Sequence, residues 1–369
     1  MSAPIAKPLD ALIQLPRAAA FVQWLVSHWR DEGIAVEQPA PERVLLSLAG
    51  VGAVELQVTA TRQLAVLLRP ATPRMGELMQ LSLTEHLGEF ADEMRWPDGS
   101  WHVAWSGQTP RSSAQLQVLQ VQSNQAITPC MRRLRLQGEG VLALADGGLH
   151  VRMLLPLPGQ APAWPTVQSD GRLQWQPGQP RLPRRTYTIR AIDLEQRWIE
   201  VDVLLHRDNE SEGNGINASP GSSWAEQAQP GSAVGVLSPA GGLLLNAARV
   251  VLVADACALP AAARMLQAAS AGASLDVLLW VADEAEQAAL DVEPTSAQID
   301  WICAGKPGAS APEIARVLQW LSQRPWQDSH PDTVLWVAGG LPLTQAVRRW
   351  TAEQAILRGV RTMIHTYWR

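Results

Sequence analysis

The sequence has few of the residues on which several common classes of protein depend. Its three cysteines, Cys130, Cys257 and Cys303, lie far apart in 369 residues, so they form neither a disulfide framework nor a zinc or iron–sulfur spacing. Lys7 and Lys306 are its only lysines, so a cationic pocket would be built mainly from arginine. The net charge of −5 argues against nucleic acid as a partner. We expect a globular protein in a reducing compartment, without a resident metal.

Long apolar runs and targeting signals are also missing. No run reaches the roughly 18 apolar residues of a membrane-spanning helix, and residues 1–20 lack the charged, apolar and small-residue order of a secretory signal. The sequence contains neither the Gly-x-Gly-x-x-Gly fingerprint in its α/β region nor an NTPase phosphate loop. We therefore expect a cytoplasmic protein without membrane insertion.

Residues 1–110 have the pattern of a small α+β module. Apolar residues recur at helical spacing in 18–33 and 75–94, and short alternating strands lie between these segments. His28 and His86 fall in the two predicted helices. The ordinary interpretation of both is a partly buried histidine where a helix packs on the sheet, and we favour it over a role as a ligand. The function of this module is left open.

The remainder of the chain changes pattern twice. Residues 113–245 read as short strands separated by Gly and Pro, which predicts an antiparallel β-barrel, with a polar loop over 207–223. Residues 246–369 alternate apolar strands with helices, which predicts a parallel sheet with helices on both faces. Ligands of such sheets bind at the carboxyl ends of the strands.

A barrel followed by a parallel α/β domain is the plan of flavin–nicotinamide electron-transfer proteins, and the segment RRTYTIR (184–190) suits it. Tyr187 can offer a π face to a flavin ring, and Thr188 can donate a hydrogen bond. Arg185 or Arg190 can neutralise phosphate oxygens with a forked pair of donors. The alternative is a strand whose arginines are merely solvated at a sheet edge.

Residues 115–369 resemble the siderophore-interacting protein family, the FAD-dependent ferric-siderophore reductases of the ferredoxin-reductase-like superfamily. Residues 16–94 resemble, more weakly, a small domain of unknown function that is sometimes fused ahead of this family. The motifs that carry the first resemblance are, in chain order, Thr128-Pro129-Cys130-Met131-Arg132-Arg133, His150-Val151-Arg152-Met153, the Arg185, Tyr187, Thr188 and Arg190 strand, His206 followed by Ser219-Pro220-Gly221-Ser222-Ser223-Trp224-Ala225, VVLVADACALPA (250–261), LWVAGG (335–340) and HTYWR (365–369).

The resemblance implies an NAD(P)H:ferric-siderophore oxidoreductase that releases iron as Fe2+, with FAD as cofactor, NADH or NADPH as donor and a ferric siderophore as partner. A flavin is suited to this task because it accepts a hydride and releases single electrons. The pyrophosphate is expected at a helix that begins at Trp224. No residue is assigned a catalytic acid or base role, and a monomer is expected. The residues implied in cofactor binding are Arg185, Tyr187, Thr188, Arg190, His206, Ser222, Ser223, Trp224, Tyr367 and Trp368.

The sequence also departs from the family pattern at the expected nicotinamide site, where Asp-Glu-Thr becomes Asp255-Ala256-Cys257 and Gly-Glu becomes Gly339-Gly340. A turn that usually carries an arginine reads Ser238-Pro239-Ala240-Gly241. The loop after His206 carries Asp208, Glu210 and Glu212, which would repel phosphate if they folded inward. The candidates for a cationic siderophore rim are Arg348, Arg349, Arg361 and Arg369.

Several assignments keep an alternative. Tyr367 and Trp368 either cap the flavin or pack against a neighbouring helix, His206 either bonds the flavin or ends its strand, and Cys257 is either a nicotinamide neighbour or a small buried apolar residue. The rim arginines are otherwise solvated charges. The departures keep open a flavin-poor or reductase-dead binding protein on the same scaffold, and a flavin reductase without siderophore preference.

Overall fold

The protein divides into two compact units in a computed structural model. One unit comprises residues 1–116 and 163–181, and the other comprises residues 117–162 and 182–369. The chain therefore passes between the units after residues 116, 162 and 181. The structure describes residues 7–31, 34–48, 51–97, 99–106, 115–145, 148–168, 172–206, 219–238, 247–269, 272–292, 297–326, 332–357 and 360–368.

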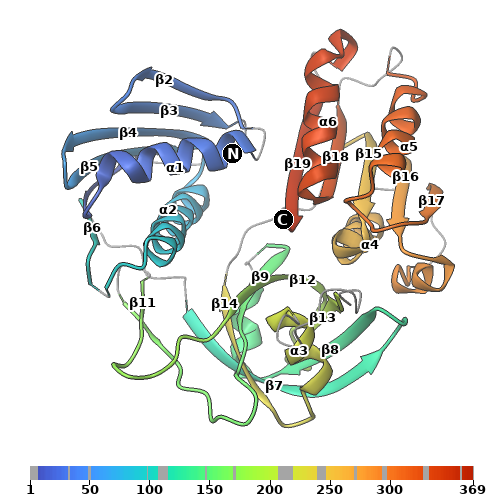
Figure 1. Cartoon of the computed structure of the whole chain (residues 1–369), viewed down its shortest axis with the longest axis horizontal. Coiled ribbons are helices and arrows are strands. Elements are labelled where there is room, and N and C mark those ends of the chain that lie inside the picture. Colours follow the sequence, from blue (N-terminus) through green and yellow to red (C-terminus); the bar gives the residue numbers. More distant parts are fainter. Residues whose placement is uncertain are drawn as a thin grey trace. The chain divides into compact units, whose positions relative to one another are not determined.

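The first unit is a six-stranded antiparallel sheet with two helices, in the strand order β2-β3-β4-β5-β1-β6. Figure 1 shows this sheet and its two helices in blue to cyan, with α1 lying along the sheet. Its elements are β1 (Leu9–Gln14), α1 (Ala18–Asp31), β2 (Val36–Ala40), β3 (Arg43–Leu48), β4 (Gly52–Ala60), β5 (Gln63–Pro70), α2 (Pro73–Glu93) and β6 (His102–Trp105).

Local sequence explains why these elements form. Burial alternates along β5, so that Leu64, Val66 and Leu68 point into one core shared with α1 and α2. Helix α2 begins at a proline, whose missing N–H costs nothing at that position. The Thr72 side chain caps the helix by accepting a hydrogen bond from the Met75 N–H at 3.2 Å.

Residues 163–181 carry the short hairpin β10 (Thr166–Val167) and β11 (Leu173–Gln174) and belong to the first unit. The guanidinium of Arg172 donates to the Trp101 carbonyl at 2.6 Å and lies 5.3 Å from the Trp101 ring centre. Arg181 forms an ion pair with Asp92 on α2. This segment lies in sequence between two barrel strands, so it is an excursion from the second unit into the first.

The second unit begins with a closed six-stranded barrel in the order β12-β13-β8-β7-β14-β9. Inward-facing apolar residues from all around it, together with Trp224, form one core. Its elements are β7 (Gln115–Ala126), β8 (Met131–Gln137), the 3₁₀ helix η1 (Glu139–Leu144), β9 (His150–Leu154), β12 (Arg184–Asp193), β13 (Trp198–Leu204), α3 (Pro220–Gln227) and β14 (Ala233–Ser238).

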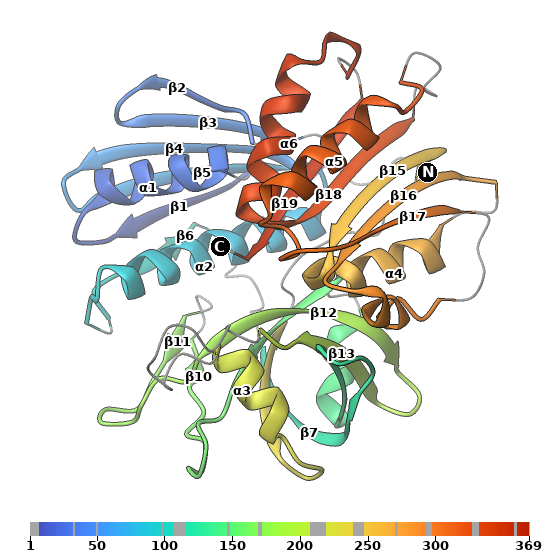
Figure 2. The ribbon, with the colours of Figure 1, turned by 45° about the vertical axis from the view of Figure 1, so that its right-hand side comes forward.

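The second part of this unit is a five-stranded parallel sheet in the order β17-β16-β15-β18-β19. Alternate residues of β15 point into two separate cores, one shared with α4 and the other with α5 and α6, so helices cover both faces (Figure 2). Its elements are β15 (Arg249–Asp255), η2 (Ala256–Ala258), α4 (Leu259–Ala268), β16 (Ser274–Val281), η3 (Glu284–Ala289), β17 (Gln298–Cys303), α5 (Ala311–Ser322), β18 (Thr333–Gly340), α6 (Leu341–Glu353), η4 (Ala355–Leu357) and β19 (Arg361–Trp368).

Polar contacts join the barrel to the parallel-sheet domain. The buried carboxylate of Glu286 on η3 accepts a hydrogen bond from the Thr128 hydroxyl at 2.6 Å and one from the Cys130 N–H at 2.9 Å. Arg133 on β8 pairs with Asp202 in the barrel and with Asp291 just beyond η3, both at 2.7 Å. The hairpin between β7 and β8 is therefore fixed to the loop that follows β16.

The predicted fold class, an α+β module followed by an antiparallel barrel and a parallel α/β domain, is confirmed. The domain limits of 1–110, 113–245 and 246–369 stay a prediction, and the grouping of 163–181 with the first unit was not anticipated. The helix expected from Trp224 begins instead at Pro220. Within the described part of the chain, no helix is long and apolar enough to cross a membrane.

Candidate functional site

The centre of the parallel sheet has a point where the strand order reverses, between β15 and β18. Ligands of open α/β sheets bind outside the carboxyl ends of the strands at such a point. Here those ends are Asp255 on β15 and Gly340 on β18. The expected nicotinamide-site residues Ala256, Cys257 and Gly339 flank them. The structure therefore brings all of these candidates together at one place.

Asp255 is fully buried and organises this edge. One carboxylate oxygen accepts from the Cys257 N–H at 3.0 Å, and the other accepts from the Gly340 N–H at 2.7 Å and the Trp368 indole N–H at 2.8 Å. Burial raises the pKa of Asp255 to about 6, although these hydrogen bonds oppose the rise. The carboxylate thus joins β15, the start of α6 and the carboxyl end of β19.

The end of β19 crosses from this edge to the barrel. The Tyr367 hydroxyl lies 3.2 Å from His150 Nε2, and the Thr188 hydroxyl lies 3.3 Å from His150 Nδ1. The register of β9 and β12 produces the second contact, because it pairs His150 directly with Thr188. Burial, followed by repulsion from His365 and Arg264, lowers the pKa of His150 to about 4. A neutral imidazole therefore links the terminal strand to the cofactor motif.

Tyr187 and α3 meet near the same edge. The Tyr187 hydroxyl occupies the space beside Gly221, where an added Cβ would lie only 2.3 Å from it. Burial raises the pKa of Tyr187, the Arg185 charge opposes this rise, and Cys257 adds to it. Burial also raises the pKa of Cys257, which keeps it a thiol. Thr188, the next residue of the motif, is linked through His150 to Tyr367 at the carboxyl end of β19, so the barrel motif and the sheet edge meet there.

The three α3 residues of the sequence prediction have different surroundings. Ser222 is buried, and its hydroxyl accepts a hydrogen bond from the His206 N–H at 2.9 Å. Ser223 is half-buried, while Trp224 packs into the barrel core. Within the described residues, Ser219 gives no side-chain cap to α3. The first-turn N–H groups, rather than the Trp224 indole, are thus the anion donors that α3 can offer.

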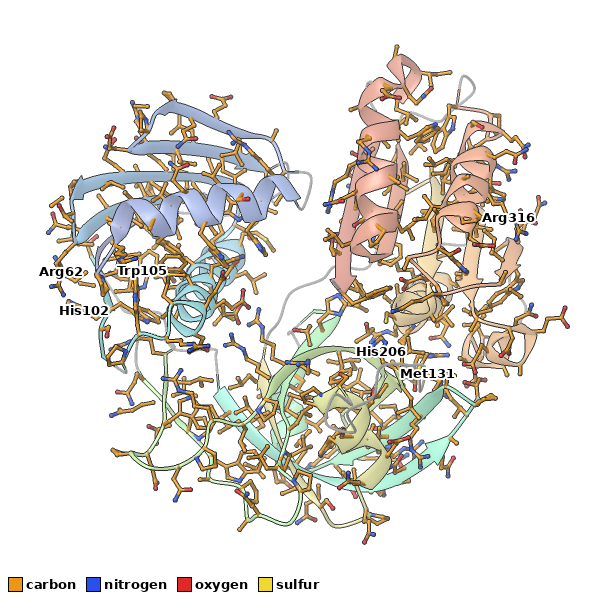
Figure 3. The ribbon with its side chains drawn as sticks, viewed as in Figure 1. Arg62, His102, Trp105, Met131, His206 and Arg316 are labelled. Atoms are coloured by element: carbon orange, nitrogen blue, oxygen red, sulfur yellow. The ribbon has the colours of Figure 1, made fainter. Side chains whose placement is uncertain are left out.

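His206 ends the described barrel segment before α3, and its side chain is exposed. Its ring centre lies 6.3 Å from that of Trp368. Figure 3 labels His206 and Met131 close together, on the side of the barrel next to the parallel-sheet domain. Met131 packs into the core on the α4 face of that domain. His206 therefore faces the carboxyl edge from the barrel side. The expected acidic loop of Asp208, Glu210 and Glu212 lies outside the described residues.

The two arginines of the RRTYTIR strand have opposite environments. Arg185 is exposed, and its guanidinium donates to the Arg184 carbonyl at 2.8 Å. Arg190 is only 4% exposed, and it donates to the Leu290 carbonyl at 3.2 Å and to the Asp291 carbonyl. Its Nε lies 4.0 Å from Asp202, which alternates with the core residues Val201 and Val203 and so marks the outer face of the barrel. Arg185 therefore faces solvent, whereas Arg190 ties the barrel to η3.

The structure describes three of the four rim arginines and does not gather those three at the carboxyl edge. Arg361 starts β19 and pairs with the start of β18, so it lies at the opposite edge of the sheet. Arg348 is half-buried and donates to the Ile364 carbonyl in the middle of β19 at 2.9 Å. Arg349 is exposed on α6. Arg369, like the Pro239-Ala240-Gly241 turn, lies outside the described residues.

Sequence reasoning assigned no role to His150, Gly221, Gly308 or Lys306. Gly308 packs against the Trp368 ring and Asp255, and the Lys306 ammonium lies 5.7 Å from the Trp368 ring centre. His150 was quoted only as part of a family motif. An apolar strand beginning with a histidine was the available signal for it. Among the described residues, no group of three or more His, Cys, Asp or Glu side chains suits a metal ion.

Comparisons with known proteins agree with this geometry. A family model described as the siderophore-interacting FAD-binding domain matches residues 120–243, and one described as siderophore-interacting protein matches residues 247–369. The chain belongs to the siderophore-interacting protein family. An NADPH-dependent ferric-chelate reductase of Escherichia coli is 28% identical over 71% of this chain and 96% of its own length.

Two solved structures of the siderophore-interacting kind are also similar. A siderophore utilization protein from T. fusca is 30% identical, with a TM-score of 0.58, over 71% of this chain and 95% of that one. The siderophore-interacting protein SipS from Aeromonas hydrophila is 26% identical, with a TM-score of 0.55, over 70% of this chain and 92% of that one. The family matches begin at residue 120, so residues 1–119 lie outside them, whereas the segment 163–181 of the first unit lies within the first match.

The residues at the site suit a flat anionic cofactor. Tyr187 supplies an aromatic ring and Thr188 a hydroxyl on the strand that the FAD-binding model covers. Because Gly221 has no side chain, the Tyr187 hydroxyl can lie against the first turn of α3, where a Cβ would clash with it. Arg185 and the first turn of α3 supply positive charge and N–H donors. This donor set fits a flavin dinucleotide.

Proposed function

We propose that this protein is an FAD-dependent reductase that takes electrons from NADH or NADPH and reduces the ferric ion of a siderophore to Fe2+, in the cytoplasm and as a monomer. The observation that carries the proposal is the contact from Thr188 through His150 to Tyr367, which links the Tyr187-Thr188 motif to the strand end where Trp368 donates to Asp255. A flavin site and a dinucleotide site must be adjacent for hydride transfer, and this contact supports such an arrangement.

The chain's own residues have distinct roles in this proposal. Tyr187 packs against the flavin ring, Thr188 offers it a hydroxyl, and Arg185 with the first turn of α3 holds the pyrophosphate. A hydrogen bond with His150 Nδ1 orients the Thr188 hydroxyl. Bound FAD would supply the conversion of a two-electron donor into single electrons for Fe3+. Fe2+ binds hard anionic oxygen ligands less well than Fe3+, so reduction opens the chelate.

Two further assignments follow the same reasoning. Arg348, Arg349, Arg361 and Arg369 stay candidates for contacts with an anionic siderophore, but Arg361 has the weakest support because it lies at the opposite sheet edge. Arg190 supports the cofactor indirectly, since its hydrogen bonds to η3 position β12. His206, Ser222 and Ser223 would line the site between the barrel and the sheet edge.

A second function has one observation in its favour. The chain's own indole, Trp368, lies at the edge where a dinucleotide would bind. A flavin-poor protein that captures siderophores without reducing them would tolerate that arrangement. The absorbance spectrum of the untreated protein separates the two functions, because bound flavin absorbs near 380 and 450 nm.

The reductase proposal then requires two further results. Anaerobic addition of NADH or NADPH should bleach the flavin bands. Addition of a ferric siderophore together with an Fe2+-trapping chelator should restore those bands and produce the coloured Fe2+ complex. A protein that stays colourless after incubation with excess FAD would refute the proposal, and flavin that no nicotinamide reduces would refute its donor.

A further inference from the structure

The carboxyl end of helix α3 is held by the side chain of Asn124 on β7. We propose that Asn124, oriented by Arg132 on β8, is a positioning residue for the FAD pyrophosphate, because it fixes the helix whose first turn would bind that group. This inference rests on the proposed function in taking FAD as the ligand of α3. The contacts do not rest on it, since they join two barrel strands to the helix whatever it binds.

The Asn124 amide bonds the end of α3 twice. Its Nδ2 donates to the Ala225 carbonyl at 2.8 Å and to the Ala228 carbonyl at 2.7 Å. The last carbonyls of a helix have no intrahelical N–H partner. Both alanines are buried, so these two acceptors require a partner from the protein. One amide group therefore satisfies two carbonyls that the end of the helix leaves open.

Arg132 determines which way the Asn124 amide points. Its Nε donates to Asn124 Oδ1 at 2.9 Å, and a guanidinium can only donate, so the amide oxygen must face Arg132. The two carbonyls can only accept, so the NH₂ group must face α3. All three partners thus require the same orientation of the amide. Arg132 also brings positive charge near the carboxyl end of the helix, which the helix dipole favours.

Strand register places both side chains on the inner face of the barrel. Asn124 pairs directly with Leu134, a core residue, and paired residues of an antiparallel ladder share a face. Arg132 lies two positions before Leu134 on the same strand, so it shares that face as well. Ala225 and Ala228 belong to the same barrel core. The polar pair is therefore part of the barrel wall against which α3 packs.

The start of α3 depends on contacts of this kind. The helix has eight residues, fewer than the roughly 12–15 that an isolated helix needs, so tertiary contacts must hold it. At its start, the Ser222 hydroxyl accepts from the His206 N–H at 2.9 Å, and the Tyr187 hydroxyl lies against Gly221. At its end, the two hydrogen bonds from Asn124 do the same. Because so short a helix moves as one body, losing the Asn124 amide should displace its first-turn N–H groups.

Riboflavin separates this role from general damage to the barrel. It carries the same ring as FAD but no phosphate, so it would use Tyr187 and Thr188 without using α3. One net hydrogen bond changes an equilibrium constant roughly fivefold. With water replacing part of what is lost, removal of two bonds should weaken FAD binding by about tenfold. Riboflavin binding should stay the same.

The test measures the dissociation constants of FAD and riboflavin by fluorescence titration of flavin-stripped protein. Asn124→Ala should bind FAD about tenfold more weakly than the wild type and riboflavin equally well. Gln125→Ala is the matched control, because Gln125 is the next residue on β7, is exposed and points to the opposite face. This control should change neither constant.

Hydrogen exchange of the flavin-free proteins reports on α3 directly. Residues 220–228 should exchange faster in Asn124→Ala than in the wild type, whereas β8 should not change. Asn124→Asp keeps the shape of the side chain and the acceptor for Arg132 but has no NH₂ group, so it should also exchange faster. Weakened FAD binding without faster exchange of α3 would make Asn124 a direct ligand and would overturn the positioning role.

Unchanged FAD affinity in Asn124→Ala would also overturn the inference, as would equal losses of FAD and riboflavin affinity. A wild-type protein that binds no FAD would refute the proposed function and this inference together. A selective loss of FAD affinity in a protein whose flavin neither NADH nor NADPH reduces would support the inference while refuting the proposed reductase. Unchanged FAD affinity in a protein whose flavin is reduced would do the reverse.

Discussion

Arg185 and Arg190 occupy neighbouring positions of one motif, yet the structure predicts opposite consequences for their replacement. Arg190 is 4% exposed, and its guanidinium donates to Gln267 at 3.2 Å and to the backbone carbonyls that end η3. Its Nε, without a hydrogen-bond partner among the described residues, lies 4.0 Å from the Asp202 carboxylate. Replacing Arg190 by alanine should therefore destabilise the folded protein itself.

The size of this effect follows from the burial. Removing one member of a buried charge network costs about 3–5 kcal/mol, because the groups left behind lose their partner. Asp202 keeps its two hydrogen bonds from Arg133, at 2.7 and 3.0 Å, so we expect the lower limit of about 3 kcal/mol. For a unit of this size, that corresponds to a fall in melting temperature of about 6–12 °C.

The assay is thermal unfolding of flavin-stripped protein, followed by titration with FAD. Arg190→Ala should melt at the lower temperature even without FAD. The exposed Arg185 is the matched control: Arg185→Ala should melt like the wild type but lose about 1.5–3 kcal/mol of FAD binding, the value of a hydrogen bond to a charged group. An Arg190→Ala protein with an unchanged melting temperature and weakened FAD binding would refute the reasoning and make Arg190 a direct phosphate ligand.

Three further outcomes are expected. Burial lowers the pKa values of His150 and His365 from 6.5 to about 4, so the unfolded chain takes up protons first as the pH falls, and stability present above pH 6.5 is lost toward pH 4. Asp255, with its raised pKa of about 6, offsets part of this loss. The free energy of unfolding measured in urea should therefore fall by about 2 kcal/mol between pH 7 and pH 5. An equal free energy of unfolding at both pH values would contradict the buried environments of these three groups. Thr128→Val removes the 2.6 Å hydrogen bond to the buried Glu286 and should cost about 1–3 kcal/mol in urea unfolding, whereas a cost near zero would mean that water replaces the hydroxyl. Arg172→Ala should make residues 163–181 cleavable in limited proteolysis mapped by mass spectrometry, and an unchanged digest would show that its contacts with Trp101 do not hold the segment.

The sequence predicted the architecture well because periodicity reports burial directly. Alternating short strands gave the barrel, and continuous apolar strands gave the parallel sheet with covered faces. The motif strand was also placed correctly in the barrel. Alternation along the strand places its two arginines on opposite faces, but it could not tell that the backbone at the end of η3 would cover Arg190.

Contacts between distant residues were harder to predict than the elements. His150 contacts Thr188 across 38 positions and Tyr367 across 217, and Trp368 contacts Asp255 across 113. These pairs depend on strand register and on the docking of two domains, neither of which periodicity encodes. The glycines at 339 and 340 looked like erosion of a family motif. The structure explains why glycine stands at position 340, because only a residue without a side chain leaves room for the Trp368 indole.

The excursion of residues 163–181 into the first unit constrains how this polypeptide can be divided. Trimming the chain before residue 117 would remove the carbonyl that Arg172 contacts and the acid that Arg181 pairs with, while the hairpin itself would remain attached to the barrel. A fragment limited to the second unit therefore requires two edits: removal of the leading segment, and a shorter link between β9 and β12. The two units are interleaved along the polypeptide and cannot be separated by a single cut.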